Sequence, residues 1–461
     1  MRQTNTGQTG ADMDLPTRLG WLTQAFLVAA AAPLVGLATL AIIRVSWITS
    51  VDQIVFFVAA PVVLAALLIV ASRRPPAVRL SLVLGFCAVA GSLLVAEGIL
   101  FAAGSLRTAP VARFTSVNPV RGLTIWEGVD SIRSRGEIAF PTIPGNVLVN
   151  RNVSIKSGAA EVHPVTPSPG LETTVLCNET GTLVTYRSDR FGFNNPDSVW
   201  DRSHVDVALV GDSYTHGLCV EPHEQTGARL AEKIPTVNLG ARGFGPLLEL
   251  AVMREYGHLL RPSSVVWIYY EGNDRYDLVG EVQRDWLVRY LREPSHRQRL
   301  AEIDIREAYG EWINEVIGEE FGPREQPGPG LVPGLRSLLT LSTLRQVIGF
   351  GVVFPAAGSR IGRLPEVMVA ARETVSEWGG RITFVYLPAF ERFRVLVGEG
   401  VPGRSEVLDA AAKAGFEVID LTSHFEETGA PRELWASPRG HLAPDGYRLM
   451  ADIIGEAVGL R

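Results

Sequence analysis

Ser213 follows a short apolar run and is the first residue of the chain whose position suggests chemistry. It lies in VALVGDSYTHG, where the apolar residues end in glycine and a polar turn begins. A serine at the carboxyl end of a buried strand, directly before a helix, can attack a carbonyl carbon while its backbone N–H faces the developing oxyanion. The tripeptide Gly-Asp-Ser is also common in turns and helix caps, so Ser213 needs partners before a reaction can be inferred.

Three further residues are of the types that such a serine needs. His441, in GHLAPDGYRLMA, precedes the last expected helix, where a neutral imidazole can act as general base. Gly243, in VNLGARGFGP, permits close backbone approach, so its N–H can donate to an oxyanion. Asn273, in YYEGND, offers a side-chain amide as another donor. Taken singly, they are explained as a surface histidine, a loop glycine and an Asx turn, but their order along the chain favours acyl-ester chemistry.

These residues need a scaffold that brings distant loops together. Apolar runs of strand length alternate with helical patterns from residue 205 onward, which predicts a parallel sheet with crossover helices. The expected strands are 205–211, 235–240, 263–274, 381–388 and 416–422, and the expected helices are 224–234, 247–260, 365–379, 406–415 and 443–458. Ligands bind such sheets at the carboxyl ends of the strands. Residues 280–362 interrupt the pattern and are expected to form an insertion, such as a lid or substrate wall.

The combination Ser213, Gly243, Asn273 and His441 resembles the SGNH, or GDSL-like, hydrolase superfamily. The resemblance covers roughly 205–280 and 364–461, and the stretch from YRSDRFGFNNP onward resembles membrane-anchored bacterial members. It implies a three-layer α/β/α sandwich with a parallel sheet, and an acyl-enzyme on Ser213. It also implies an oxyanion hole made by the N–H groups of Ser213 and Gly243 and the amide of Asn273. No metal or organic cofactor is implied.

The sequence departs from that family at the third member of the triad. The family places Asp three residues before the histidine, and here that position is Pro438. We expect a dyad in which a backbone carbonyl within 437–439 accepts the second N–H of His441, with modest esterase rates. We expect Asp445 to cap the closing helix and Asp420 to end its strand, whereas Asp212 and Asp274 should shape turns. The rival carboxylates nearest in sequence are Glu433, Asp420 and Asp445.

The first hundred residues predict a membrane anchor with three transmembrane helices. Apolar stretches at about 22–43, 53–72 and 80–104 carry only one charge, Glu97 in the third, and are long enough to cross roughly 30 Å of hydrocarbon. Arginines number five on the amino-terminal side and three on the other, which favours a cytoplasmic amino terminus and an external soluble domain. The expected domains are the anchor at 1–104, an irregular entry segment at 105–204, and the catalytic domain at 205–461.

Charge and cysteine content indicate which other kinds of binding site and cross-link to expect. The net charge is −6 and no run of Lys or Arg occurs, so nucleic-acid binding is not expected. The three cysteines form no CxxC pair, which argues against a zinc site. We expect Cys177 and Cys219 to form a disulfide, because both lie in the part placed outside the cytoplasm.

Three functions stay open at this point. The first is an extracytoplasmic esterase acting on an acylated glycan, a lipid or a small ester, in the inner membrane of a bacterium. The second is an O-acyltransferase that passes the acyl group to a sugar hydroxyl, with an acyl-donor partner in the membrane because three helices are too few for a donor channel. The third is a non-enzymatic binding protein of the same fold.

Overall fold

The structure is a computed structural model of two compact units. It describes residues 15–44, 51–107, 125–176, 183–321, 335, 338–347, 350–352, 361–393, 395–397, 403–436 and 440–459. The first unit spans 1–106, 327–358 and 395–400, and the second spans 107–326, 359–394 and 401–461.

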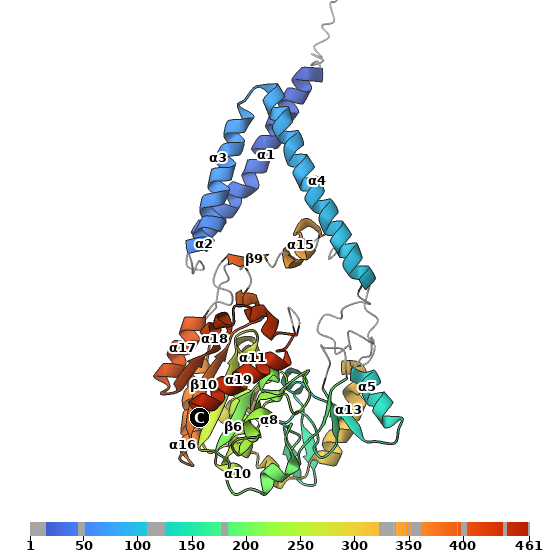
Figure 1. The fold of residues 1–461 in the computed structure, drawn as a ribbon, viewed down its shortest axis with the longest axis vertical. Helices are drawn as coiled ribbons and strands as arrows, with labels where there is room; N and C mark the ends of the chain where they lie inside the picture. The colour runs from blue at the N-terminus through green and yellow to red at the C-terminus, as the bar shows by residue number, and fades with distance from the viewer. Residues whose placement is uncertain are drawn as a thin grey trace, which may run out of the picture. The chain divides into compact units, whose positions relative to one another are not determined.

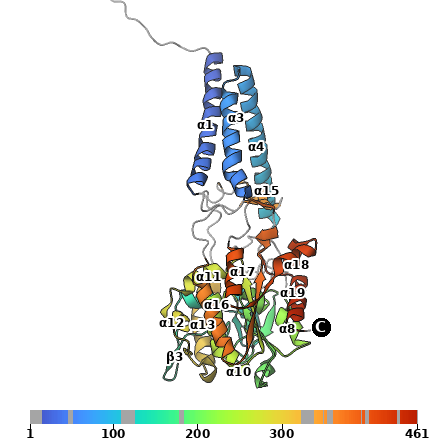
Figure 2. The same cartoon turned by 90° about the vertical axis from the view of Figure 1, so that its left-hand side faces the viewer.

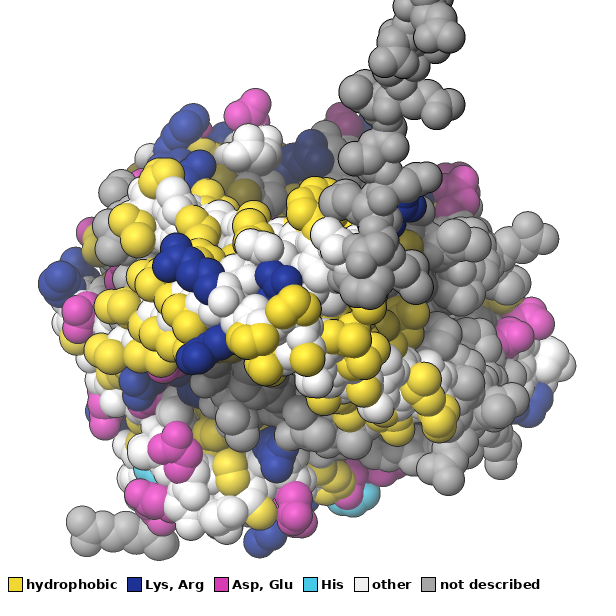
Figure 3. Space-filling model, turned by 90° about the horizontal axis from the view of Figure 1, so that it is seen from above, with side chains coloured by type: hydrophobic (Ala, Val, Ile, Leu, Met, Phe, Trp, Pro, Cys, Tyr) yellow, Lys and Arg dark blue, Asp and Glu magenta, His cyan; other side chains and the backbone are white. Residues whose placement is uncertain are grey.

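Three helices of the first unit are long and apolar enough to cross a membrane. They cover Thr17–Ile43, Val51–Ser72 and Pro76–Leu100, close to the stretches that the sequence predicts. Large apolar side chains lie exposed along these helices; Trp21 and Val89, for example, each have 63% of their surface exposed. Figure 3, the view from above, shows many hydrophobic side chains at the surface. So much exposed apolar surface is expected of helices that lie in hydrocarbon.

The second apolar helix contains a π-helical turn that the sequence analysis does not predict. The segment runs as α2 (Val51–Ile54), η2 (Val55–Ala59) and α3 (Ala60–Ser72), and Pro61 lies in the first turn of α3. Proline lacks an N–H and its ring crowds the carbonyl four residues earlier, so the helical ladder widens just before it. The neighbouring helices are α1 (Leu15–Ile43) and α4 (Pro76–Arg107).

Part of the predicted insertion belongs to this first unit. Glu97 of α4 is fully buried and accepts the backbone N–H groups of Thr343 and Leu344 at 2.7 and 2.6 Å. These residues begin α15 (Ser342–Val347), so Glu97 satisfies N–H groups that have no partner within the helix. Strand β9 (Phe350–Val352) follows and pairs in parallel with β11 (Val395–Val397).

The second unit is built on a five-stranded sheet, as the sequence predicts, and every neighbouring pair is parallel. The spatial order is β12-β10-β8-β6-β7, and Figure 1 labels two of these strands, β6 and β10. The strands are β6 (Val207–Gly211), β7 (Thr236–Asn238), β8 (Ser264–Tyr270), β10 (Arg381–Leu387) and β12 (Glu417–Asp420). In chain order this is 2-1-3-4-5, a doubly wound arrangement.

Helices cover both faces of the sheet, because alternate strand residues are buried on opposite sides. Leu209, Val266 and Val385 pack in one core with α8 (Thr226–Ala231), α18 (Leu421–Glu427) and α19 (Pro444–Ala457). Their neighbours in the strands pack in the other core with α9 (Pro246–Val252), α16 (Leu364–Ser376) and α17 (Arg404–Lys413). Figure 2 shows α16 on one side of the sheet and α8 and α19 on the other.

The remaining elements lie in or beside the loops. The helix after α9 continues as a π turn, η4 (Met253–Gly257), and α10 (His258–Leu260). The first half of the insertion contains the helices α12 (Asp285–Arg292) and α13 (Arg306–Phe321). The entry segment contains α5 (Ile125–Arg133), β1 (Ala139–Pro141), α6 (Gly145–Asn150), β2 (Ile155–Ser157), β3 (Ala160–Val162), β4 (Thr173–Val175) and β5 (Thr185–Arg187).

Candidate active site

The sheet topology locates the site before any side chain is considered. The chain leaves β6 toward β7 on one side and later returns to β8 on the other, so the strand order reverses between β6 and β8. Crevices form at the carboxyl ends of the strands at such a reversal. Ser213 follows β6 and begins α7 (Ser213–His216), and Asn273 follows β8 and precedes α11 (Asp274–Glu281).

Ser213 and His441 meet at this edge of the sheet although 228 residues separate them. The serine Oγ lies 2.9 Å from the imidazole Nε2, which is hydrogen-bond distance. Ser213 is buried, with 7% of its surface exposed. A serine hydroxyl in contact with an imidazole is the geometry that proton transfer to a general base requires.

The turn before Ser213 is fixed by Gly211 and Asp212. A side chain at Gly211, which has φ +156°, would clash with the Thr215 hydroxyl and with the carbonyl of Ile268. Asp212 is the N-cap of α7, and its Oδ1 accepts the N–H of Tyr214 at 2.9 Å. Burial raises the pKa of Asp212 to about 6, against the lowering effect of that N–H. As predicted, Asp212 shapes the turn by bonding a backbone amide.

The loop that carries His441 is held by contacts on both sides. The hydroxyl of Tyr214 donates to the carbonyl of Gly440 at 3.2 Å, and the Tyr214 ring lies 4.9 Å from the His441 ring, centroid to centroid. The N–H of Ala436 donates to the His441 carbonyl at 2.9 Å. The second ring nitrogen, Nδ1, lies 4.0 Å from the sulfur of Cys219. Residues 437–439 lie outside the described residues, so the expected backbone support for His441 stays a prediction.

Two of the three rival carboxylates are engaged elsewhere. Asp420 ends β12, as predicted; it pairs with Arg404 and accepts the N–H of Thr422 at the start of α18. Asp445 lies 2.9 Å from Arg448 on the surface. The prediction that Asp445 caps the closing helix is wrong, because Ala443 is the N-cap of α19, leaving Asp445 in the first turn. A carboxylate in the first turn of a helix still interacts favourably with the positive end of the helix dipole.

The loop that carries Gly243 is fixed by backbone hydrogen bonds to two segments. The N–H of Ala241 donates to Gly211 at 3.1 Å, and the N–H of Gly145 in α6 donates to Arg242 at 2.8 Å. Gly243 has φ +65°, a conformation that favours glycine. The position of Gly243 in the site is therefore set jointly by the Ser213 turn and by the entry segment.

His216 is a residue of the site that no sequence motif identifies. It is fully buried; its Nδ1 accepts the N–H of Arg242 at 3.3 Å, and its Nε2 lies 3.2 Å from the Tyr186 hydroxyl. Burial lowers the pKa of His216 to about 3, so the ring stays neutral and keeps its acceptor nitrogen. Its position three residues after Ser213, on the same helix, is the one sequence signal for this role.

The entry segment braces the site through two asparagines of its RFGFNNP stretch. Asn195 donates from Nδ2 to the carbonyl of Asn238 at 2.8 Å and accepts the N–H of Asn238 at 2.7 Å. Asn194 donates to the carbonyl of His216 at 3.2 Å. Asn195 also donates to the buried carboxylate of Asp189 at 2.8 Å. The stretch therefore extends the edge of the sheet at β7, although it forms no regular element.

Asn273 is oriented by the helix that follows it. Its Nδ2 donates to Asp277 Oδ2 at 2.7 Å, and the same amide lowers the pKa of Asp212, which places it beside the residue next to Ser213. Asp274 accepts the N–H of Tyr270 at 2.7 Å, so it shapes this turn as predicted. Burial, together with the charge of Asp212, raises the pKa of Asp277 to about 7.

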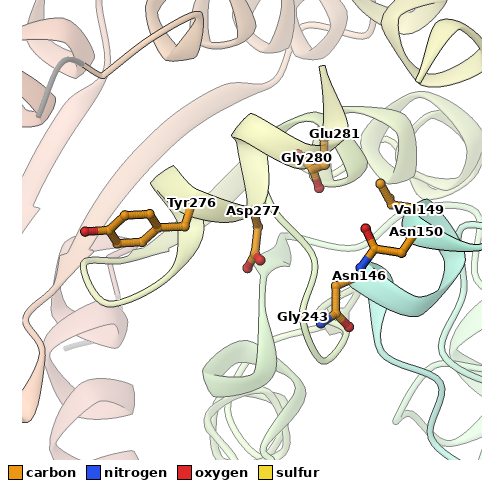
Figure 4. A pocket seen from close by; sticks show the side chains of 8 residues that line it. All are labelled: Asn146, Val149, Asn150, Gly243, Tyr276, Asp277, Gly280 and Glu281. Carbon is orange, nitrogen blue, oxygen red and sulfur yellow. The ribbon is translucent and has the colours of Figure 1, made fainter. Parts of the chain in front are cut away.

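A cavity of about 200 Å³ adjoins this part of the site. Gly243 lines it directly, and Asp277 links it to Asn273. Figure 4 shows Asn146 and Asn150 on one side of the space and Asp277 on the other. The lining residues are Asn146, Val149, Asn150, Gly243, Tyr276, Asp277, Gly280 and Glu281. The cavity thus lies between the entry segment and the helix that follows Asn273.

Within the described residues, no group of three or more His, Cys, Asp and Glu side chains is placed to hold a metal ion. Cys219 is buried and disulfide-bonded, whereas Cys87 is a free cysteine. Cys177 lies outside the described residues, so its pairing with Cys219 stays a prediction. Comparison with protein families, with curated proteins and with solved structures found no match.

Proposed function

We propose that the chain is a membrane-anchored serine esterase of the SGNH type, which cleaves acyl esters through an acyl-enzyme on Ser213. The observation that carries the proposal is the 2.9 Å contact between Ser213 Oγ and His441 Nε2 at the point where the strand order reverses. The resemblance of Ser213, Gly243, Asn273 and His441 to the SGNH residues supports the same assignment.

The reaction follows from these positions. His441 takes the hydroxyl proton as Ser213 Oγ attacks the ester carbon, and the carbonyl oxygen becomes an oxyanion. The N–H groups of Ser213 and Gly243 and the amide of Asn273 donate to that oxyanion. When the intermediate collapses, His441 returns the proton to the departing alcohol, and water then releases the acid by the same steps.

The proposed machinery is a dyad. With Pro438 at the family's aspartate position, a backbone carbonyl within 437–439 fixes the tautomer of His441. A carbonyl stabilises the imidazolium less than a full negative charge does, so we expect modest rates. The pairing of Asp420 with Arg404, and of Asp445 with Arg448, supports this proposal because it occupies two rival carboxylates.

We place the catalytic unit outside the cytoplasm. The three apolar helices support a membrane protein, and the arginine distribution of five against three favours a cytoplasmic amino terminus. An odd number of crossings then carries the second unit to the other side. The ester substrates within reach there are acylated glycans, lipids and small esters of the cell envelope.

The second candidate function is that of an O-acyltransferase, and the cavity beside Gly243 is the observation that supports it. A sugar hydroxyl held there attacks the same acyl-enzyme as water does. A donor partner in the membrane supplies the acyl group in that case. The third alternative, a non-enzymatic binding protein, has less support, because a binding protein does not need the contact between Ser213 and His441.

The test is turnover of an activated acetyl ester by the purified full chain in detergent, with and without oligosaccharide acceptors. Release of acetate alone supports the esterase, and acetylated oligosaccharide supports the transferase. A folded protein that does neither would support the binding protein. Ser213→Ala is the matched control for both activities.

A further inference from the structure

We propose that the cavity beside Gly243 binds a single uncharged sugar ring, so that the ester cleaved at Ser213 is carried by a carbohydrate. This inference rests on the proposed esterase function and names its substrate class. It concerns the alcohol part of the ester, whose identity the reaction at Ser213 does not determine.

The position of the cavity connects it to the reacting atoms. Gly243, a proposed oxyanion donor, forms part of its wall. Asp277, another wall residue, holds the amide of Asn273 at 2.7 Å. A group bound in the cavity therefore lies against the residues that would surround the ester carbonyl.

The size of the cavity limits what it takes. At about 200 Å³ it is smaller than the roughly 300–1,000 Å³ of pockets that enclose drug-sized ligands. Among the described lining residues the large apolar side chains are Val149 and Tyr276, and Figure 4 shows the Tyr276 ring directed away from the space. A long acyl chain finds neither the length nor the apolar wall that it needs.

The polar groups of the wall suit hydroxyls. Asn146 and Asn150 are four residues apart on α6, so their amides lie on one face of that helix, and each amide both donates and accepts. Asp277 faces them from α11 (Figure 4). The ring of Tyr276 points away from the two asparagines in Figure 4 and lies under the Arg275 guanidinium, so Asn146, Asn150 and Asp277 are the polar groups that face the space. These groups match the alternating donors and acceptors of a sugar ring.

The charges of the wall argue against an anionic ligand. Among the eight described lining residues none is Lys or Arg, and two are carboxylic acids. Glu281 is already used, because its oxygens accept the N–H groups of Gly245 and Leu247 at 2.8 and 2.9 Å. Two arginines contact lining residues, but both are engaged there: Arg284 donates to the Asn150 carbonyl and Arg275 to the Tyr276 hydroxyl. A phosphate or carboxylate beside Asp277 would face that carboxyl group, whereas a neutral hydroxyl has partners.

Gly280 offers a way to fill the cavity without breaking the fold. It lies in α11 and lines the cavity, and a Cβ placed on it meets no heavy atom within 4 Å. Gly280→Phe therefore places a large side chain in open space, and phenylalanine is a better helix residue than glycine. Gly318→Phe is the matched control, because Gly318 lies in α13, also has nothing within 4 Å of its Cβ, and does not line the cavity.

The experiment measures kcat/KM of the full-length protein for a panel of monoacetylated monosaccharides and for vinyl acetate, whose alcohol part is too small to need the cavity. We expect the wild type to prefer at least one sugar ester. Gly280→Phe should lower the ratio of sugar-ester to vinyl-acetate kcat/KM by about tenfold, mainly through KM, because it removes binding of the sugar. Asn146→Ala should lower the same ratio, and Gly318→Phe should leave it unchanged.

Each outcome decides between the two proposals. A wild type that prefers no sugar ester, or a Gly280→Phe variant that keeps the wild-type ratio, would overturn the sugar site while leaving the esterase intact. Equal loss on both substrates would also overturn it, because the damage would then lie in the reaction and not in sugar binding. Vinyl-acetate turnover that persists in Ser213→Ala would instead refute the esterase.

Discussion

Replacing Asp277 by Asn should make the protein more stable at alkaline pH and leave it unchanged at acidic pH. The Asp277 carboxyl has a pKa of about 7 in the folded chain against 3.8 as the ordinary value, and burial is the main cause. Because the folded state binds this proton more tightly than the unfolded state, wild-type stability falls as pH rises from about 4 through about 7. An asparagine does not titrate, and its carbonyl can still accept the N–H of Asn273.

The size of the effect follows from the pKa shift. A shift of about three units corresponds to roughly 4 kcal/mol at 1.36 kcal/mol per unit. Asp277 lines a cavity and is half-buried, so solvent screening lowers the expected gain to about 2 kcal/mol at pH 8. At pH 4 both variants carry a neutral group, and their free energies of unfolding should agree.

Urea unfolding of the full chain in detergent at pH 4, 6 and 8 measures this difference. Asp285→Asn is the matched control, because Asp285 is an exposed carboxylate at the start of the next helix. The Asp277→Asn gain should grow with pH, and the control should show none. A gain that is the same at every pH, or a loss at pH 8, would refute the assignment of a buried, raised-pKa carboxyl.

Three further predictions concern the brace, the dyad and the topology. Asn195→Ala leaves the buried N–H and C=O of Asn238 without a partner, so thermal or urea unfolding should show a loss of about 3–5 kcal/mol; a loss below about 1 kcal/mol would show that the brace is dispensable. His441→Ala should abolish ester turnover, and a single carboxylate variant that matches it with unchanged stability would identify a third triad member. The variants to compare are Glu433→Gln, Asp420→Asn and Asp445→Asn. A reporter active only outside the cytoplasm, fused after residue 461, should be active; activity only from a cytoplasmic reporter would reverse the orientation.

The regular elements of the second unit were accessible from the sequence because burial imposes a period on it. The run from Val207 to Gly211 is buried throughout, as a central parallel strand requires, and Pro444–Ala457 shows the helical period of an amphipathic helix. The three apolar helices were predicted differently, from long stretches that carry almost no charge. The order of strands then places the loops of Ser213 and Asn273 at one edge.

The contacts that complete the site produce no repeating pattern in the sequence. Asn195 and Asn238 are 43 residues apart and are joined by hydrogen bonds. The residues around Asn195 and those around Asn238 contain no pattern that predicts this pairing. The burial of Glu97 against α15 depends on a segment some 245 residues away. The error at Asp445 has a local cause: Pro444 occupies the first helical position, so the N-cap falls on Ala443. Hydrogen bonds between irregular segments depend on the folded geometry, which composition alone does not predict.

The central claim is that Ser213 is the nucleophile of an acyl-ester reaction, and its removal tests that claim most directly. Steady-state turnover of an activated acetyl ester should fall by about 10⁵-fold in Ser213→Ala, because the remaining groups cannot form an acyl-enzyme. Circular dichroism and the unfolding midpoint should match those of the wild type, since the described contacts of the Ser213 hydroxyl are with the side chains of His441 and Asp212. A folded Ser213→Ala protein that keeps more than about a few per cent of wild-type turnover would contradict the account, because loss of a true nucleophile costs several orders of magnitude.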